Sequence, residues 1–295
     1  MNHLDTILLV AAALAYLLGS MAYGAHLSLR LPLLARYGRL AAVLGSVAHT
    51  VAIGVHCAHT HATPFRTPAE TLSASAWAIV TAYLTLDLVA KQKPTALGAF
   101  ALPAAFLCVF GGAVLEAGQR PTTVLQPHLP GWPENQPLPS TFGSTGNLES
   151  GVVSLHVIAL LFAFGLLVLA FGTSILYLTQ HRLLKQKKFV GLFGKLPPLN
   201  TLDHQAFTLV AFAFPLLSVG IISGALRAAT GGLAGAWMVD PKILTSAVTW
   251  ALYGAYLLLH GAPSWRGVRA NYLLIGGLLL ALLTYFIPTT AHRFG

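Results

Sequence analysis

The sequence predicts an all-α bundle of about eight transmembrane helices, and three observations lead to this fold class. Apolar residues make up 56% of the chain and charged residues only 8%, against about 25% charged residues in a soluble domain. Apolar segments of about 20 residues, the length that crosses a bilayer as a helix, recur along the whole chain. Runs such as 158–178 do not alternate apolar and polar residues, which argues against the strands of a membrane β-barrel.

The expected spans are 5–25, 38–58, 71–90, 96–116, 152–178, 203–226, 242–262 and 271–289. Together they are expected to form a single integral membrane domain over residues 1–295. The longest connection, 117–151, is rich in Pro, Gly, Ser and Thr, so we expect an irregular outer loop there. Pro241 suits the first turn of the seventh span, because the first helical position needs no backbone N–H.

Pairs of small residues four positions apart predict close packing between helices. One pair is Gly220 and Gly224 in the sixth span, and another is Ser20 and Gly24 in the first.

The basic residues predict which end of each span faces the cytoplasm, because cytoplasmic loops carry an excess of Lys and Arg. With both termini outside, most of the 17 basic residues fall in the four cytoplasmic loops or at their edges. These residues are Arg30, Arg36, Arg39, Lys91, Lys93, Arg182, Lys185, Lys187, Lys188, Lys195, Arg266 and Arg269. The net charge of +9 is therefore mainly a topology signal, and no basic soluble face exists that would bind nucleic acid.

Histidines lie at membrane depth, where an ionisable side chain is costly and usually functional. His49 is near the middle of the second span, and His56 follows seven residues later on nearly the same face. His156 opens the fifth span at the outer side, His260 lies near the inner end of the seventh, and His292 follows the eighth at the outer side. Neutral imidazole is a common axial ligand of haem iron, so these positions point to haem ligation.

The histidines form one well-matched pair and one mismatched pair. His156 and His292 are far apart in the sequence but at similar depth, as the two axial ligands of one haem must be. His49 lies about 16 Å above the inner boundary and His260 only about 3 Å above it, at 1.5 Å per residue. A hydrogen bond between helices is therefore the alternative role for His49.

Acidic residues inside the spans are few, with Asp87 near an inner end and Asp5 and Glu116 at outer edges. A proton pump normally carries carboxylates deep in its bundle. The sequence also contains no P-loop, HExxH or GxSxG motif, so hydrolases and ATPases have no motif to support them.

Several short motifs make the chain similar to the cytochrome c assembly protein family, in particular its CcsA-like and HemX-like members. The likeness covers residues 30–294 and is strongest from 152 onward. The motifs are Leu155-His156-Val157, Leu176 to Gln180, Leu202-Asp203, Phe214 to Leu217, Gly220 to Ala225, Asp240-Pro241-Lys242, Thr249-Trp250, Trp265-Arg266-Gly267 and Ala291 to Phe294.

The resemblance implies an eight-span membrane protein that handles haem. In that family, two outer histidines flank a tryptophan-rich loop and hold haem at the outer face, and His156 and His292 match those positions. The loop falls at 229–241, where Trp237 is the only tryptophan and Asp240 begins the matching Asp-Pro-Lys sequence. Further membrane histidines are proposed to bind a second haem, and His260 matches one of them, with His49 as its candidate partner.

We therefore expect a non-covalent b-type haem at an outer bis-histidine site, in a protein that binds and presents haem rather than catalysing a reaction. The expected location is a bacterial inner membrane, and the expected partners are lipid, haem, and an apocytochrome or other assembly proteins. Three alternatives stay open. They are a HemX-like assembly or regulatory protein that no longer binds haem, a small-molecule permease, and an intramembrane enzyme.

Overall fold

The computed structural model describes residues 3–29, 31–60, 63–65, 67–90, 94–118, 147–187, 196–230, 240–262 and 265–287. Within these ranges the chain forms eight α-helices. They are α1 (His3–Leu29), α2 (Pro32–Thr60), α3 (Pro68–Val89), α4 (Thr95–Gly118), α5 (Asn147–Lys185), α6 (Leu199–Thr230), α7 (Pro241–Leu259) and α8 (Val268–Phe286).

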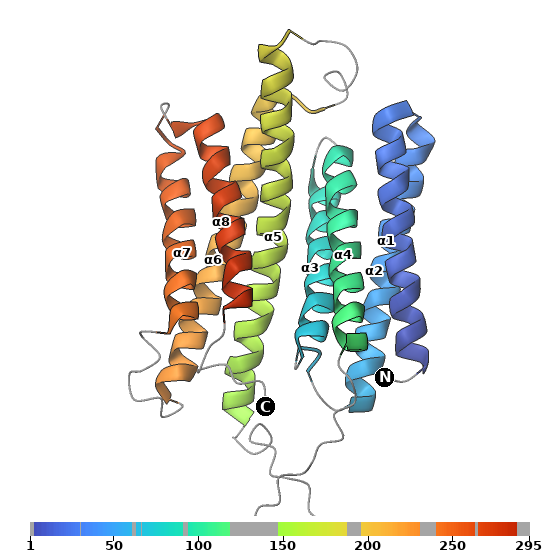
Figure 1. The fold of residues 1–295 in the computed structure, drawn as a ribbon, viewed down its shortest axis with the longest axis vertical. Coiled ribbons are helices and arrows are strands. Elements are labelled where there is room, and N and C mark those ends of the chain that lie inside the picture. Colours follow the sequence, from blue (N-terminus) through green and yellow to red (C-terminus); the bar gives the residue numbers. More distant parts are fainter. Residues whose placement is uncertain are drawn as a thin grey trace, which may run out of the picture.

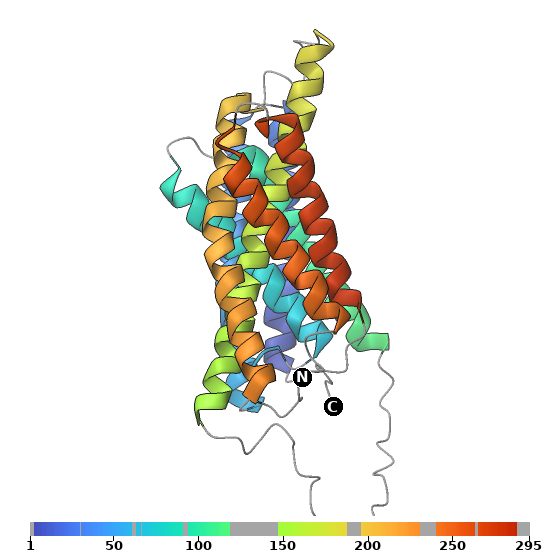
Figure 2. The same ribbon diagram turned by 90° about the vertical axis from the view of Figure 1, so that its left-hand side faces the viewer.

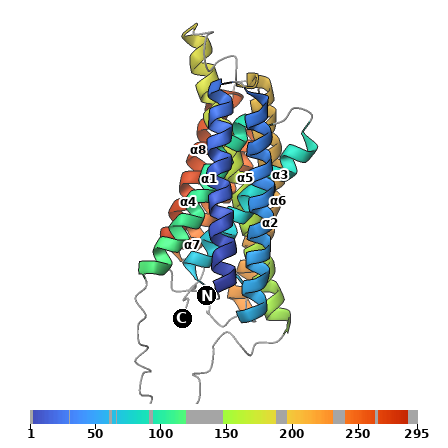
Figure 3. The same cartoon turned by 90° about the vertical axis from the view of Figure 1, so that its right-hand side faces the viewer.

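The helices stand side by side and run alternately up and down, as Figure 1 shows. The first four form one group and the last four another, and the two groups meet where α5 packs against α3 and α4. In the view of Figure 2, α6, α7 and α8 lie in front, whereas Figure 3 shows α1 and α2 on the opposite side. Following the charge-based orientation, we call the end at which α1, α3, α5 and α7 begin the outer end.

The fold class predicted from the sequence is confirmed. Seven helices are long and apolar enough to cross a membrane, and the eighth, α8, is apolar but shorter over its described residues Val268–Thr284. The chain is therefore a polytopic, helical integral membrane protein. Several helices extend beyond the expected spans: α2 begins at Pro32 rather than 38, and α6 runs over Leu199–Thr230 rather than 203–226. The largest difference is in α5, which ends at Lys185 rather than 178 and begins at Asn147, inside the range 117–151 that we expected to be loop. Residues 119–146 of that range lie outside the described residues.

Small residues allow the helices to approach closely. A Cβ at Gly165 of α5 would lie 3.0 Å from the backbone of Ala78 in α3, so this glycine sets the contact between the two groups. The prediction for Gly220 and Gly224 is confirmed, because both pack against α5. The prediction is wrong for Gly24, which has open space beside it, and Gly19 makes the close contact on α1 instead.

Two helices begin at the outer end with clear capping signals. The Oγ1 atom of Thr67 accepts a hydrogen bond from the backbone N–H of Glu70 at 3.1 Å, with Pro68 at the start of α3. Asp240 caps α7 by accepting from the backbone N–H of Lys242 at 2.8 Å. The position of Pro241 in the first turn of α7 confirms the sequence prediction.

Candidate functional site

His156 is held in a defined orientation near the outer end of α5. Its Nδ1 atom lies 2.6 Å from the carbonyl oxygen of Gly220 in α6. A carbonyl only accepts hydrogen bonds, so Nδ1 must carry the proton and donate it. In a neutral ring the lone pair is then on Nε2, which is the usual arrangement of a metal-ligating histidine.

The small residues of α6 make this arrangement possible. A Cβ added at Gly224 would lie 2.5 Å from Cε1 and 2.6 Å from Nδ1 of His156, closer than real contacts allow. The imidazole therefore occupies the space that any other side chain at position 224 would fill. The small residues of α6 thus leave room for the imidazole of His156, and they also allow α5 and α6 to pack closely.

His260 lies just beyond α7, at the inner end of the same group of helices. Its Nε2 atom is 3.5 Å from Oδ2 of Asp203 in α6, and its ring stacks on Phe207 with centroids 4.7 Å apart. Among the described residues, its buried Nδ1 atom has no hydrogen-bond partner.

His49 has a different environment, in the group formed by α1 to α4. It is fully buried, and both of its ring nitrogens face hydroxyl groups. Tyr16 Oη lies 3.2 Å from Nδ1, and Ser73 Oγ lies 3.0 Å from Nε2. These contacts join α1, α2 and α3, and they favour the interhelical hydrogen bond that the sequence left as an alternative.

The structure brings some of the expected site residues together and separates others. His156 and His260 both contact α6, at its opposite ends. His49 lies on α2, which packs against α1, α3 and α4, whereas α7 packs against α6 and α8. Asp240 is buried and caps α7. His292 and Trp237 lie outside the described residues, so their expected roles stay predictions.

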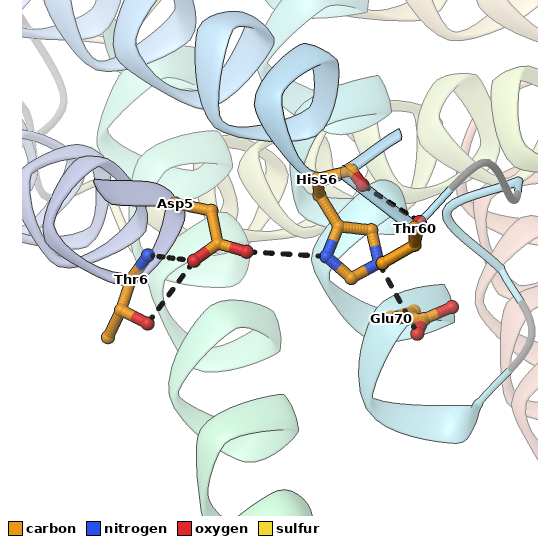
Figure 4. A network of polar contacts seen from close by, with 5 residues as sticks. All are labelled: Asp5, Thr6, His56, Thr60 and Glu70. Carbon is orange, nitrogen blue, oxygen red and sulfur yellow. Dashed lines mark hydrogen bonds and ion pairs between the residues drawn. The ribbon is translucent and has the colours of Figure 1, made fainter. Parts of the chain in front are cut away.

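A second polar cluster at the outer end was not foreseen as a site. His56 lies between two carboxylates, with Nδ1 3.4 Å from Asp5 Oδ2 and Nε2 3.6 Å from Glu70 Oε1, as Figure 4 shows. The sequence did predict that His49 and His56 share a face, and this is confirmed because both line one cavity. The Thr-x-x-Glu capping pattern at Thr67 was the signal that could have placed Glu70 at the outer end.

Asp87 also has a partner that sequence reasoning missed. Its carboxylate lies 2.9 Å from Nε of Arg39 and accepts from a terminal nitrogen of that guanidinium at 3.2 Å. The pair joins α2 to α3 near the inner end. We therefore interpret this ion pair as a structural contact between the two helices.

These features define the class of protein: a helical membrane protein that holds an oriented histidine toward the outer end of the helix group α5 to α8. Comparison with known proteins then identifies the family. The model of the family described as cytochrome C assembly protein matches residues 67–291, about three quarters of the chain. The chain belongs to this family, which confirms the resemblance read from its motifs.

Individual relatives are consistent with this assignment. The chain is 30% identical over 169 residues to a cytochrome c biogenesis protein CcsA of Guillardia theta, covering 50% of this chain and 55% of that protein. It is 28% identical over 150 residues to protein HemX of Bacillus subtilis, covering 51% and 54%. A CcsA of Trieres chinensis is 23% identical over 275 residues, covering 83% and 80%. The matches to the first two relatives thus span about half the length of each.

Proposed function

We propose that this chain binds haem at its outer end and presents it during cytochrome c assembly. The observation that carries the proposal is the orientation of His156, whose Nδ1 donates to the Gly220 carbonyl and so leaves the lone pair on Nε2. Family membership supports the biological setting, because relatives are named cytochrome c biogenesis proteins.

The residues present fit the chemical needs of haem. Porphyrin supplies four of the iron's ligands, so the protein needs to supply only one or two axial groups. His156 is the first of these in the proposal, and His292 is the second. Trp237 would pack on the porphyrin face, and Lys242 or Arg293 would pair with a propionate. Haem is cargo in this scheme, and the chain's own residues bind it, orient it and exclude water from it.

His260 is proposed as a ligand of a second haem at membrane depth. Asp203 contacts one of its ring nitrogens, and Phe207 fixes the plane of the ring. The Nδ1 atom of His260 is buried and has no hydrogen-bond partner in the described part of the chain. It is therefore the atom that would bind the iron. His49 would need to give up Tyr16 or Ser73 to act as the partner ligand, so its role as a ligand stays the weaker part of the prediction.

The proposed setting is a bacterial inner membrane, with the outer end toward the side on which cytochromes c are assembled. The proposed partners are lipid and an apocytochrome held by another assembly protein. Two other functions give different outcomes. A HemX-like protein that has lost haem would purify without it, and a permease would transport its solute whether or not His156 is present.

The test is an absorption spectrum of the purified protein, expressed with haem supplied and then reduced with dithionite. We expect sharp α and β bands from a six-coordinate haem, because two imidazoles give a low-spin iron. His156→Ala should remove the bands of the outer haem, and added imidazole should restore them by replacing the missing ligand.

The matched control is His181→Ala, which removes a histidine from the inner end of the same helix, where the ring stacks on Tyr177. This variant should keep the bands of the outer haem. A wild-type protein without a Soret band, or a His156→Ala variant with an unchanged spectrum, contradicts the proposal.

A further inference from the structure

His260, just beyond α7, is contacted by two side chains from one face of α6. Asp203 and Phe207 are four residues apart in α6, so they project in nearly the same direction. Oδ2 of Asp203 lies 3.5 Å from Nε2 of His260, and the ring of Phe207 stacks on the imidazole with 4.7 Å between centroids. The ring of Tyr256 is tilted against the same imidazole at 5.5 Å. The imidazole therefore has two aromatic neighbours and a carboxylate beside one of its nitrogens.

The carboxylate of Asp203 determines which nitrogen of His260 is available to a ligand. A carboxylate only accepts hydrogen bonds, so the nitrogen beside it, Nε2, is favoured to carry the proton of the neutral ring. The lone pair is then on Nδ1, which is buried and has no hydrogen-bond partner among the described residues. A carboxylate at one ring nitrogen and a metal at the other is a common arrangement of metal-bound histidine.

A structural ion pair of this chain, Arg39–Asp87, has a different geometry. There the carboxylate lies 2.9 Å from a guanidinium that is always charged. Asp203 lies farther from its partner, at 3.5 Å, and a neutral imidazole offers it only the dipole of an N–H group. The contact becomes stronger when the other ring nitrogen of His260 binds a cation, because the metal draws electron density from the ring. The geometry of Asp203 therefore suits a metal-bound histidine better than a contact that serves the fold alone.

The two proposed haem ligands differ in the charge of the group that orients them. Nδ1 of His156 donates to the backbone carbonyl of Gly220, which carries no net charge. Asp203 instead places a negative charge beside the ring of His260. The exposed Arg266 donates to the backbone carbonyl of His260 at 2.8 Å and not to its ring. A negative charge beside the ligand favours ferric over ferrous iron, because ferric iron carries one more positive charge.

We propose that Asp203 is a positioning residue for the inner haem. It keeps the ring proton of His260 on Nε2, presents Nδ1 to the iron and stabilises the ferric state. This role rests on the second haem of the proposed function. It adds a regulation of that site, because Asp203 sets how readily the inner haem is reduced.

The test is a reductive titration with dithionite of the purified full-length protein carrying His156→Ala, which removes the outer haem and leaves the inner one. His156→Ala/His260→Ala should lose the remaining bands, which assigns them to the inner site. Asp203→Asn, added to His156→Ala, keeps the shape of the side chain and removes its charge. We expect the midpoint potential of the inner haem to rise by about 59 mV, which corresponds to a tenfold weaker preference for ferric over ferrous iron in a one-electron couple.

Two more variants in the same background separate charge from packing. Asp203→Glu keeps the carboxylate and should return the midpoint potential toward that of the parent protein. His204→Gln is the matched control, because it changes the adjacent residue, whose side chain is exposed, and it should leave the potential unchanged. An unchanged potential in Asp203→Asn overturns the proposal, and so does an equal shift in His204→Gln. Loss of haem from Asp203→Asn, without a shift in the haem that remains, also overturns it and leaves Asp203 a structural role only.

The haem-free protein provides a readout that does not depend on the second haem. In protein labelled with the NMR-active nitrogen isotope in histidine, the ring signals of His260 are assigned by their loss in His260→Ala. They should show the proton on Nε2, and Asp203→Leu should give a mixture of the two neutral tautomers. A proton on Nδ1 with Asp203 in place overturns the positioning role. Absence of inner haem bands together with a proton on Nε2 would instead contradict the second haem of the proposed function and support the tautomer of His260.

Discussion

The two helix groups use the same residue type, histidine, in different ways. In α1 to α4, His49 contacts Tyr16 and Ser73, and His56 contacts two carboxylates, so both ring nitrogens of each histidine face protein groups. In α5 to α8, Nδ1 of His156 donates to the backbone carbonyl of Gly220. Nε2 of His260 lies beside the carboxylate of Asp203. Hydrogen-bond networks that join three helices stabilise a fold, whereas a histidine whose tautomer is set through one ring nitrogen has the form in which histidine binds a metal through the other. The following predictions test this difference.

The largest expected effect is a loss of stability in the first group. Arg39→Leu removes the guanidinium beside the buried carboxylate of Asp87. We expect the free energy of unfolding in mixed micelles to fall by about 3 kcal/mol, because a buried charge is left without its ion-pair partner. The double variant Arg39→Leu/Asp87→Leu should recover most of this loss. Similar values for the single and double variants would show that the pair does not carry the effect.

His49→Ala tests whether the buried histidine is structural. It removes two interhelical hydrogen bonds, worth about 0.6 kcal/mol each in membrane proteins, and it leaves a void in the core. We expect a total loss of about 2 kcal/mol in the free energy of unfolding. The visible spectrum should not change. Loss of haem bands in this variant, with stability preserved, would place His49 among the ligands and would end the distinction between the two groups.

Gly224→Ala tests the second group, where we expect haem binding to suffer more than the fold. The new Cβ would lie 2.5 Å from Cε1 of His156, so the ring must move away from the Gly220 carbonyl. We expect haem affinity, measured by spectral titration, to fall by about tenfold, or 1.4 kcal/mol. Gly276→Ala in α8 is the control, because a Cβ there meets open space. Equal affinities in both variants would remove Gly224 from the support of His156.

The sequence predicted the helices well and the site only in part. Eight apolar segments were sufficient to place every helix, because each segment must span the bilayer on its own. The sequence also predicted that His156 lies toward the outer side and that His49 and His56 share a helix face. It did not predict which residues these histidines contact. Tyr16, Asp5 and the Gly220 carbonyl come from other helices, and a helix periodicity says which face a residue occupies but not which neighbour meets that face.

The smallest expected effect comes from replacing two tryptophans, one in each helix group, whose indole N–H donates one interhelical hydrogen bond. Trp250 Nε1 donates to Ser218 Oγ at 2.8 Å and joins α7 to α6, whereas Trp77 Nε1 donates to Thr50 Oγ1 at 2.9 Å and joins α3 to α2. Each Trp→Phe change removes one such bond, so each should lower the free energy of unfolding by about 0.6 kcal/mol. Because Ser218 lies in the same helix as Gly220 and Gly224, Trp250→Phe is the variant that we expect to change the position of His156 and so the haem spectrum. An unchanged spectrum in both variants would show that this helix holds the imidazole without help from α7.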